Sequence, residues 1–118
     1  MNFLKLLTLA FIIALASFGG SGLCADNPAD TPLLIDVRTE PEWNEGHLEG
    51  AILVPYEKIG EAIARIAPDK KTKINLYCRT GRRSGIALET LKKLGYENVT
   101  NYGTVQDASE KLKIPVVK

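Results

Sequence analysis

The chain has few residues of the kinds that form disulfide frameworks or metal centres. Its 118 residues include two cysteines, Cys24 and Cys78, and one histidine, His47. We therefore expect neither a bound metal nor a cofactor. The formal net charge is +1, so the chain lacks the broad basic field that binding to nucleic acid requires. A chain of this length forms one domain with one modest core.

Acidic residues are absent from the first 25 positions, and the pattern there differs from the rest. Lys5 precedes an apolar run over 6–18, and small residues follow at 19–22. This order is typical of a secretory signal peptide, and the run is too short to span a membrane comfortably. Leu23 and Ala25 fit positions −3 and −1 of a cleavage site. We expect a signal peptide at 1–25 and a mature domain at 26–118. The location would be periplasmic or otherwise exported, without stable membrane insertion after the signal is removed.

Cys24 allows an alternative, in which it is the lipid-modified cysteine of a lipoprotein. Leu23 stands where lipoprotein signals have a small residue, and Ser21 stands where they have an aliphatic one. If ordinary cleavage removes Cys24, Cys78 is the single thiol of the mature chain. An exported domain with one cysteine cannot form an internal disulfide, so its unpaired thiol needs an explanation.

Apolar, strand-like runs alternate with helical patterns along the rest of the chain. The pattern predicts strands over 33–37, 51–54, 72–77 and 98–102. It also predicts a short helix capped by Thr39 and ended by Gly46, and helices over 59–66, 86–94 (beginning near Ser84) and 105–112. This alternation predicts an α/β domain with an open, mainly parallel sheet and helices on both faces. Cys78 directly follows the third strand, at the edge where such sheets place their sites.

The segment from Cys78 to Ser84 combines the cysteine with a glycine and three arginines. Gly81 permits a tight turn, so successive backbone N–H groups can form a cup around the sulfur. The cup and the start of the following helix would lower the pKa of the thiol. The arginines would attract an anion. The segment therefore indicates a nucleophile that acts on anions without a general base, and we assign His47 a structural hydrogen bond.

Cysteine phosphatases and sulfurtransferases both place a cysteine in such an anion cup. The phosphatase pattern has five residues between the cysteine and an arginine that binds phosphate oxygens. Here Arg83 comes after four residues, and Ser84 stands where that arginine is needed. The spacing excludes the phosphatase pattern. A tighter cup brings the amides closer to the sulfur, which suits a persulfide.

The chain resembles single-domain rhodaneses, which are thiosulfate sulfurtransferases, and most of all the small periplasmic phage-shock type. The matching segments cover nearly all of residues 26–118: 35–38, 42–43, 46–52, 54–55, 77–84, 95–99 and the ending at 114–115. Gly103-Thr104 departs from the usual Gly-Gly, and Ala108 stands near the position of a frequent tryptophan. These departures put the packing of the C-terminal segment in doubt.

The resemblance implies a rhodanese fold and a ping-pong transfer of sulfur from thiosulfate to cyanide or a thiol acceptor. Cys78 would be catalytic and would carry the persulfide. The implied substrate-binding residues are Arg79, Thr80, Gly81, Arg82, Arg83 and Ser84, and the implied structural supports are Asp36, Arg38 and His47. Arg83 is left open between a substrate contact and a structural tie to an acid, and Trp43 is expected in the core.

Two other functions remain open beside the transferase. One is a rhodanese module that carries persulfide or binds a partner without fast turnover. The other is a redox- or metal-responsive thiol, because exposed cysteines of low pKa oxidise readily. A resolving cysteine is missing from residues 26–118, which weakens the redox interpretation.

Overall fold

The computed structural model describes residues 31–118. The expected signal peptide, its cleavage site and Cys24 lie outside these described residues. The elements in chain order are β1 (Leu33–Asp36), α2 (Glu40–Glu45), β2 (His47–Leu48), β3 (Ile52–Leu53), α3 (Ile59–Ile66), β4 (Ile74–Cys78), α4 (Arg82–Lys93), β5 (Val99–Thr104), α5 (Val105–Leu112) and β6 (Val116–Val117).

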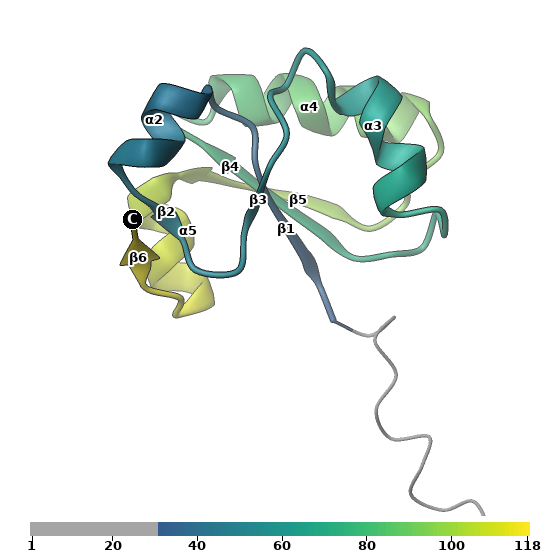
Figure 1. Ribbon diagram of the computed structural model, residues 1–118. Helices are drawn as coiled ribbons and strands as arrows, with labels where there is room; N and C mark the ends of the chain where they lie inside the picture. Colours follow the sequence, from purple (N-terminus) through teal and green to yellow (C-terminus); the bar gives the residue numbers. More distant parts are fainter. Residues whose placement is uncertain (1–30) are drawn as a thin grey trace, which may run out of the picture.

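The main sheet has four parallel strands in the order β3-β1-β4-β5 (Figure 1). Its central strand β4 is buried along its whole length, as expected of a parallel strand covered on both faces. Leu33 lies opposite Ile74, and Asp36 lies opposite Tyr77. The carboxyl ends of β1 and β4 therefore meet at one edge of the sheet. This confirms the predicted α/β class with its mainly parallel sheet.

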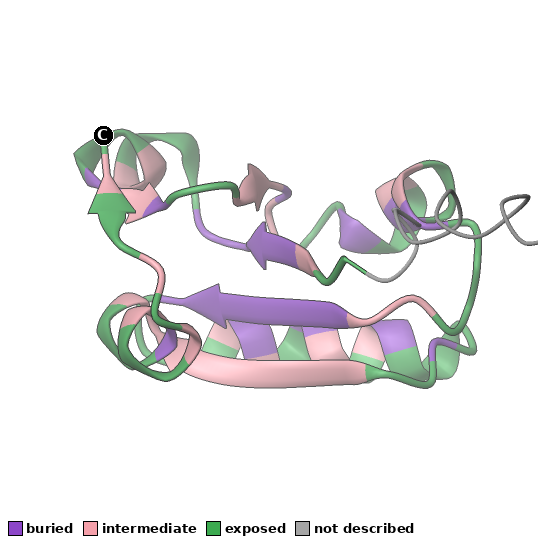
Figure 2. Ribbon diagram, turned by 90° about the horizontal axis from the view of Figure 1, so that it is seen from below, coloured by how far each residue is buried: buried purple, intermediate pink, exposed green. Residues whose placement is uncertain are grey.

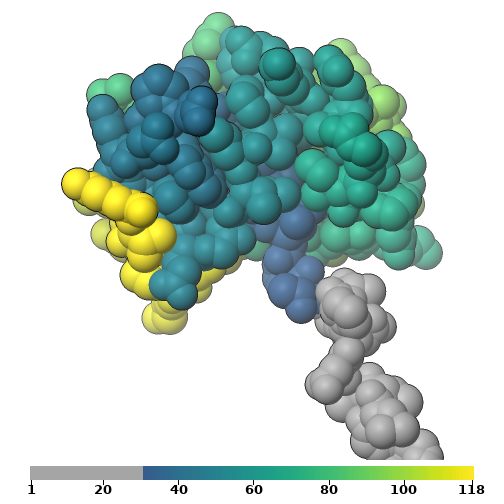
Figure 3. Space-filling view, in the orientation of Figure 1, coloured from purple at the N-terminus to yellow at the C-terminus, as the bar shows by residue number. Residues whose placement is uncertain are grey.

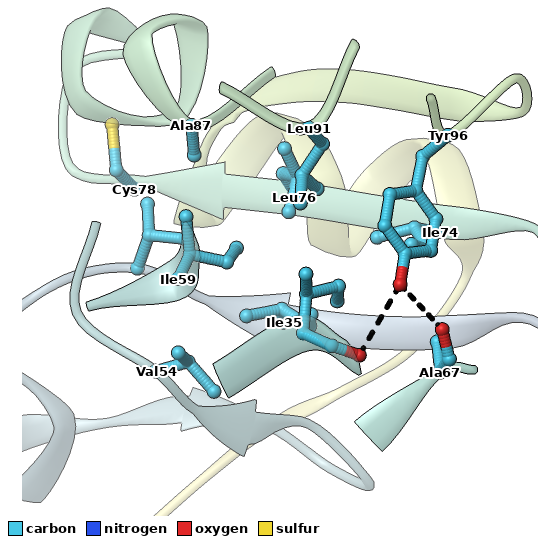
Figure 4. Packing of buried hydrophobic residues seen from close by; sticks show 12 residues of the cluster. Ile35, Val54, Ile59, Ala67, Ile74, Leu76, Cys78, Ala87, Leu91 and Tyr96 are labelled. Atoms are coloured by element: carbon cyan, nitrogen blue, oxygen red, sulfur yellow. Dashed lines mark hydrogen bonds between the residues drawn. The ribbon is translucent and has the colours of Figure 1, made fainter. Parts of the chain in front are cut away.

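Helices cover both faces of the sheet, as predicted. On one face α3 and α4 pack on a core that includes Ile35, Ile59, Leu76 and Leu91, all fully buried (Figure 4). On the other face α5 packs on a smaller cluster around Leu48, Tyr77 and Ala108. Figure 2 shows β4 buried along its length beside β5, the outermost strand of the sheet, which is only half-buried. Alternate residues of β4 thus serve the two cores, and Cys78 belongs to the larger one.

A second, two-stranded sheet was not predicted. β2 pairs antiparallel with β6, so that His47 lies opposite Val117 and Leu48 lies opposite Val116. Figure 3 shows the yellow C-terminal segment on the surface beside residues of the first half of the chain. The pairing fixes the C-terminus against the turn that follows α2.

The two departures noted in the sequence, Thr104 and Ala108, lie at the start of α5 and within it. Thr104 is the N-cap of α5, because its Oγ1 accepts a hydrogen bond from Asp107 N at 2.9 Å. Ala108 is fully buried in the smaller core. A threonine in place of the second glycine therefore gives α5 a capped start, and the alanine fills a place in the smaller core.

Two local predictions were wrong. The helix after the cysteine begins at Arg82, not near Ser84 or Ile86, because Gly81 turns the chain with a φ of +96° directly into the first turn. Trp43 is half-buried, since α2 contains no buried residue. Its ring stacks on His47 with centroids 3.5 Å apart.

Candidate active site

Cys78 ends β4, where the register with β5 is irregular. Leu76 lies opposite Asn101, but Cys78 lies opposite Thr104, so β5 has an additional residue between these pairs. Because the additional residue is in β5, β4 keeps its regular alternation, and Cys78 lies in the same core as Leu76. Figure 4 shows the Cys78 side chain at the end of β4, close to Ala87 of α4. The thiol is fully buried, and Cys78 is the free cysteine of the described residues.

The sulfur of Cys78 is surrounded by donors from the start of α4. Gly81 N donates to Sγ at 2.9 Å, and the Ser84 hydroxyl lies 3.4 Å from it. Gly81 has a left-handed conformation as the N-cap of α4, which L side chains rarely adopt. This conformation directs its amide at the sulfur. A helix N-terminus and an amide together favour negative charge at that point.

Burial and hydrogen bonding act on the thiol in opposite directions. Burial alone would raise the pKa of Cys78, because it disfavours the thiolate. The hydrogen bonds from Ser84, Gly81 and Thr80 together outweigh burial and lower the pKa below its ordinary value. Of the predicted cup, the structure shows the Gly81 amide and the Ser84 hydroxyl facing the sulfur. These donors favour the thiolate without a histidine.

Arg83 is held by an acid from α2. Its two terminal nitrogens donate to the two carboxylate oxygens of Glu42, each at 2.9 Å. This bond lowers the pKa of Glu42 to about 2 and raises the pKa of Arg83. Both side chains are largely buried, with exposures of 21% and 17%. Of the two roles left open for Arg83, this geometry corresponds to the structural tie to an acid.

The other two arginines of the segment are directed to solvent. Arg79 is 70% exposed and lies 3.8 Å from Glu42, a distance at which an exposed pair contributes little. Arg82 is exposed on the first turn of α4. Thr80 is also exposed, and its hydroxyl accepts from Arg82 N at 3.4 Å. Arg79 and Arg82 are thus the exposed charges of this segment.

Asp36 and Arg38 form a buried pair beside the site. Arg38 Nε and Nη2 donate to the Asp36 carboxylate, and the Nη2 distance is 2.7 Å. Arg38 Nη2 also donates to Gly46 O at 2.6 Å. The pair thereby joins the carboxyl end of β1 to the end of α2, in the arrangement expected of structural supports.

His47 is separated from the sulfur by its place on β2. Its Nδ1 lies 3.0 Å from Trp43 O, at the end of α2. Its ring stacks on Trp43, with 5° between the planes. The structure therefore places His47 in the contacts of a structural residue and brings it into no described contact with Cys78.

Two residues of the site were missed by the sequence analysis. Glu42 was noted only as part of a motif, yet it binds Arg83 across 41 positions. Asn101 was not singled out, yet its side chain binds both Ser84 and Gly81. A polar residue on the strand next to that of the cysteine was the available signal for Asn101.

Within residues 31–118 no cluster of three or more potential metal ligands is present. Over the same part of the chain, no helix has the length and apolar character needed to cross a membrane.

A cysteine at the end of a central parallel strand, with a backbone amide directed at its sulfur and arginines in the following turn, is the arrangement that defines the site. The chain belongs to the rhodanese-like domain family, whose pattern matches residues 23–104.

Individual relatives agree with this assignment. The chain is 39% identical over 84 residues to thiosulfate sulfurtransferase PspE of Escherichia coli K12, covering 71% of this chain and 77% of that protein. It is 36% identical over 94 residues to a putative mitochondrial thiosulfate sulfurtransferase of Schizosaccharomyces pombe, covering 69% and 66%. These relatives support a rhodanese sulfurtransferase enzyme.

Solved structures show the same fold. A structure described as a rhodanese with anions from E. coli superimposes with a TM-score of 0.69 at 38% identity, covering 75% of this chain and 99% of that one. A rhodanese-related protein from Thermoplasma volcanium gives a TM-score of 0.60 at 30% identity, covering 73% and 83%. The expected rhodanese fold is thereby confirmed.

Proposed function

We propose that this chain is a thiosulfate sulfurtransferase that carries the transferred sulfur as a persulfide on Cys78. The observation that carries the proposal is the 2.9 Å contact from Gly81 N to Cys78 Sγ. It supports a stabilised sulfur anion in a site without a general base. The similarity to sulfurtransferases of E. coli and S. pombe supports the choice of reaction.

The proposed reaction has two halves. The Cys78 thiolate attacks the outer sulfur of thiosulfate, the sulfur–sulfur bond of thiosulfate breaks, and sulfite leaves with the electron pair. A thiol or cyanide then attacks the outer sulfur of the persulfide, and Cys78 leaves as a thiolate. No net oxidation occurs and no cofactor is needed. The donors of Gly81 and Ser84 stabilise the negative sulfur in both halves.

The arginines have different proposed tasks. Arg79 and Arg82 are exposed, so they attract the thiosulfate dianion and assist the departure of sulfite. Thr80, Gly81 and Ser84 supply the remaining contacts of the substrate site. Arg83 supports the loop through its ion pair with Glu42, because both of its terminal nitrogens donate to that carboxylate.

The proposal is tested with the protein lacking residues 1–25, thiosulfate and cyanide. Thiocyanate formation is compared between the wild type and Cys78→Ser, and we expect activity in the wild type alone. Equal rates of thiocyanate formation in the two proteins would contradict the proposal that Cys78 catalyses sulfur transfer. Mass spectrometry after thiosulfate alone should show the gain of one sulfur atom on Cys78. That gain without turnover would instead support the persulfide-carrier module.

We also propose that residues 1–25 are a signal peptide and that the rhodanese domain spans 26–118 in an exported protein. The sequence pattern at 1–25 supports this, and the acceptor would then be a thiol of the exported compartment or cyanide. N-terminal sequencing of the purified secreted form should begin at Asp26. A lipid-blocked N-terminus at Cys24 would show the lipoprotein alternative instead.

A further inference from the structure

Asn101 lies on β5 opposite Leu76, and its side-chain hydrogen bonds connect the two segments beside the sulfur. Its Oδ1 accepts from the Ser84 hydroxyl at 2.6 Å and from Gly103 N at 2.9 Å. Its Nδ2 donates to Gly81 O at 3.2 Å. The side chain therefore holds both residues whose donors face Cys78.

The Ser84 hydroxyl has one hydrogen and three acceptors within reach. The distances from Ser84 Oγ are 2.6 Å to Asn101 Oδ1, 3.2 Å to Gly81 O and 3.4 Å to Cys78 Sγ. A hydroxyl donates one hydrogen bond at a time but can accept others. Ser84 is fully buried, so water does not replace a lost partner. The shortest contact goes to Asn101, and the sulfur competes for the same hydrogen.

We propose that Asn101 is a positioning residue, which holds the Ser84 hydroxyl hydrogen while Cys78 Sγ is neutral and releases it when Sγ becomes an anion. A neutral thiol donates its own hydrogen to Ser84 Oγ, and the serine passes its hydrogen on to Asn101. An anionic sulfur accepts a charge-assisted bond, which is stronger than a neutral one. The hydroxyl then turns toward Sγ. Asn101 thereby opposes the formation of the thiolate that Ser84 favours.

Asn101 also contacts the turn at Gly81, and its proposed effect on the Ser84 hydroxyl does not depend on this contact. Its Nδ2 contact with Gly81 O helps to fix the turn, but Gly81 O also accepts from Gly85 N at 3.0 Å within α4. The turn is thus held by the helix when Asn101 is absent. Removing the Asn101 side chain should free the Ser84 hydroxyl without displacing the Gly81 amide from the sulfur.

The inference rests on the proposed function, in which Sγ alternates between anionic and neutral forms. In the first half of the reaction Sγ forms a bond to the incoming sulfur, and its negative charge passes to the sulfite that leaves. The hydroxyl hydrogen returns to Asn101. In the second half Sγ regains the electron pair as the bond to the outer sulfur breaks, and the hydroxyl turns back to it. Ser84 thus assists sulfur release by donating a hydrogen bond to Sγ. In the persulfide state the Ser84 hydroxyl instead donates to Asn101 Oδ1.

The test measures alkylation of Cys78 by iodoacetamide between pH 5 and pH 10 in the protein comprising residues 26–118. Alkylation reports the thiolate fraction and uses no sulfur donor, so it is independent of turnover. We expect Asn101→Ala to react about three- to tenfold faster than the wild type at pH 6, since it removes one competing hydrogen bond. The rate plateau at high pH should be unchanged. Ser84→Ala should react more slowly than the wild type at pH 6.

Three comparisons decide whether the effect passes through Ser84. In a Ser84→Ala background, Asn101→Ala should have no further effect on the pH profile. Asn101→Asp keeps the acceptor and adds negative charge, so it should slow alkylation at pH 6. Thr100→Ala changes the adjacent residue of β5, which points to the opposite face of the sheet, and should match the wild type.

Other results would overturn the proposal. An Asn101→Ala rate at pH 6 equal to or below that of the wild type would show a residue that only supports the turn. Asn101 would also only support the turn if Asn101→Ala changed the alkylation rate equally in the wild-type and Ser84→Ala backgrounds. A change in the high-pH plateau rate as large as the change at pH 6 would lead to the same conclusion. Loss of thiocyanate formation with the expected alkylation profile would contradict the proposed function and leave this inference intact.

Discussion

The ion pair between Glu42 and Arg83 should make the stability of the domain depend on pH. Glu42→Gln is the suitable change, because glutamine keeps an oxygen for the capping contacts and removes the charge. Glu42 Oε1 accepts from Thr39 N at 3.0 Å and from Thr39 Oγ1 at 2.9 Å. Those contacts complete a capping box for α2. The variant therefore isolates the charge that binds Arg83.

The size of the effect follows from the pKa of Glu42. The hydrogen bonds from Arg83 are the largest cause that lowers it from 4.5 to about 2. That difference corresponds to about 3 kcal/mol at neutral pH as an upper limit. The contacts with Thr39 supply part of the shift and persist in the variant. We therefore expect Glu42→Gln to lower the free energy of unfolding by about 2 kcal/mol at pH 7.

The sign of the pH dependence is fixed by the direction of the shift. The folded-state pKa of Glu42 is lowered, so its stabilisation is complete above the unfolded value of 4.5 and is lost as the pH falls toward about 2. The glutamine variant has no such loss. The difference in stability between wild type and variant should therefore narrow between pH 5 and pH 2.

Urea unfolding followed by circular dichroism at pH 7, 5, 4 and 3 measures this difference. Glu45→Gln changes an exposed carboxylate at the end of the same helix and serves as the matched control, with an expected change of less than about 0.5 kcal/mol. A gap between wild type and Glu42→Gln that is equal at pH 3 and pH 7 would refute the reasoning. So would a gap no larger than that of the control.

Three further changes follow from the same contacts. Arg79→Ala should raise the KM for thiosulfate about three- to tenfold in the thiocyanate assay, because an attracting charge is lost. Arg65→Ala, at an exposed arginine of α3, is the control. An unchanged KM in Arg79→Ala would show that Arg79 does not attract thiosulfate. Asp36→Asn should lower the free energy of unfolding by about 3–5 kcal/mol in urea, since it leaves Arg38 buried without its charge partner; a loss under about 1 kcal/mol would contradict this. Thr104→Ala should cost about 1 kcal/mol through the lost N-cap, and Thr104→Ser should recover most of it; equal losses in both variants would argue against the cap.

The main sheet could be predicted because its strands carry their own signal. β1 and β4 are short, mainly apolar runs, and a helical pattern lies between them in the sequence. Their alternation with helices implies a parallel sheet, and this places Cys78 at the carboxyl edge. The prediction succeeded where local pattern and tertiary structure point the same way.

The small sheet could not be predicted in this way. β2 and β6 have two residues each and pair across most of the described chain, so no local period marks them. The start of α4 was misplaced for a related reason. The apolar spacing that marks this helix begins only at Ile86, whereas the left-handed conformation of Gly81 lets the helix begin at Arg82.

The site shows the same division between local signal and spatial pairing. The cysteine, the glycine and the arginines lie in one segment, so their joint chemistry could be inferred from their order. Glu42 and Asn101 reach that segment from another helix and another strand. A single sequence does not show which acidic residue pairs with which arginine when the two are far apart in the chain. The two alternatives for Arg83 stayed open for this reason.

The pairing of Glu42 with Arg83 also bears on how charge is distributed over the site. An anion that recruited Arg83 would have to replace two charge-assisted hydrogen bonds of 2.9 Å, in a pair that is largely shielded from water. Arg79 and Arg82 have no comparable partner to give up, and both are exposed. Under the proposed function, Arg79 and Arg82 would therefore attract a small dianion without the loss of such bonds. Arg83 instead fixes the first turn of α4 against α2, which keeps the Gly81 amide directed at the sulfur and the Ser84 hydroxyl within reach of it. On this argument Arg83→Lys, which loses the paired geometry but keeps the charge, should disturb the alkylation profile of Cys78 more than the KM for thiosulfate, and the reverse order would place Arg83 on the substrate.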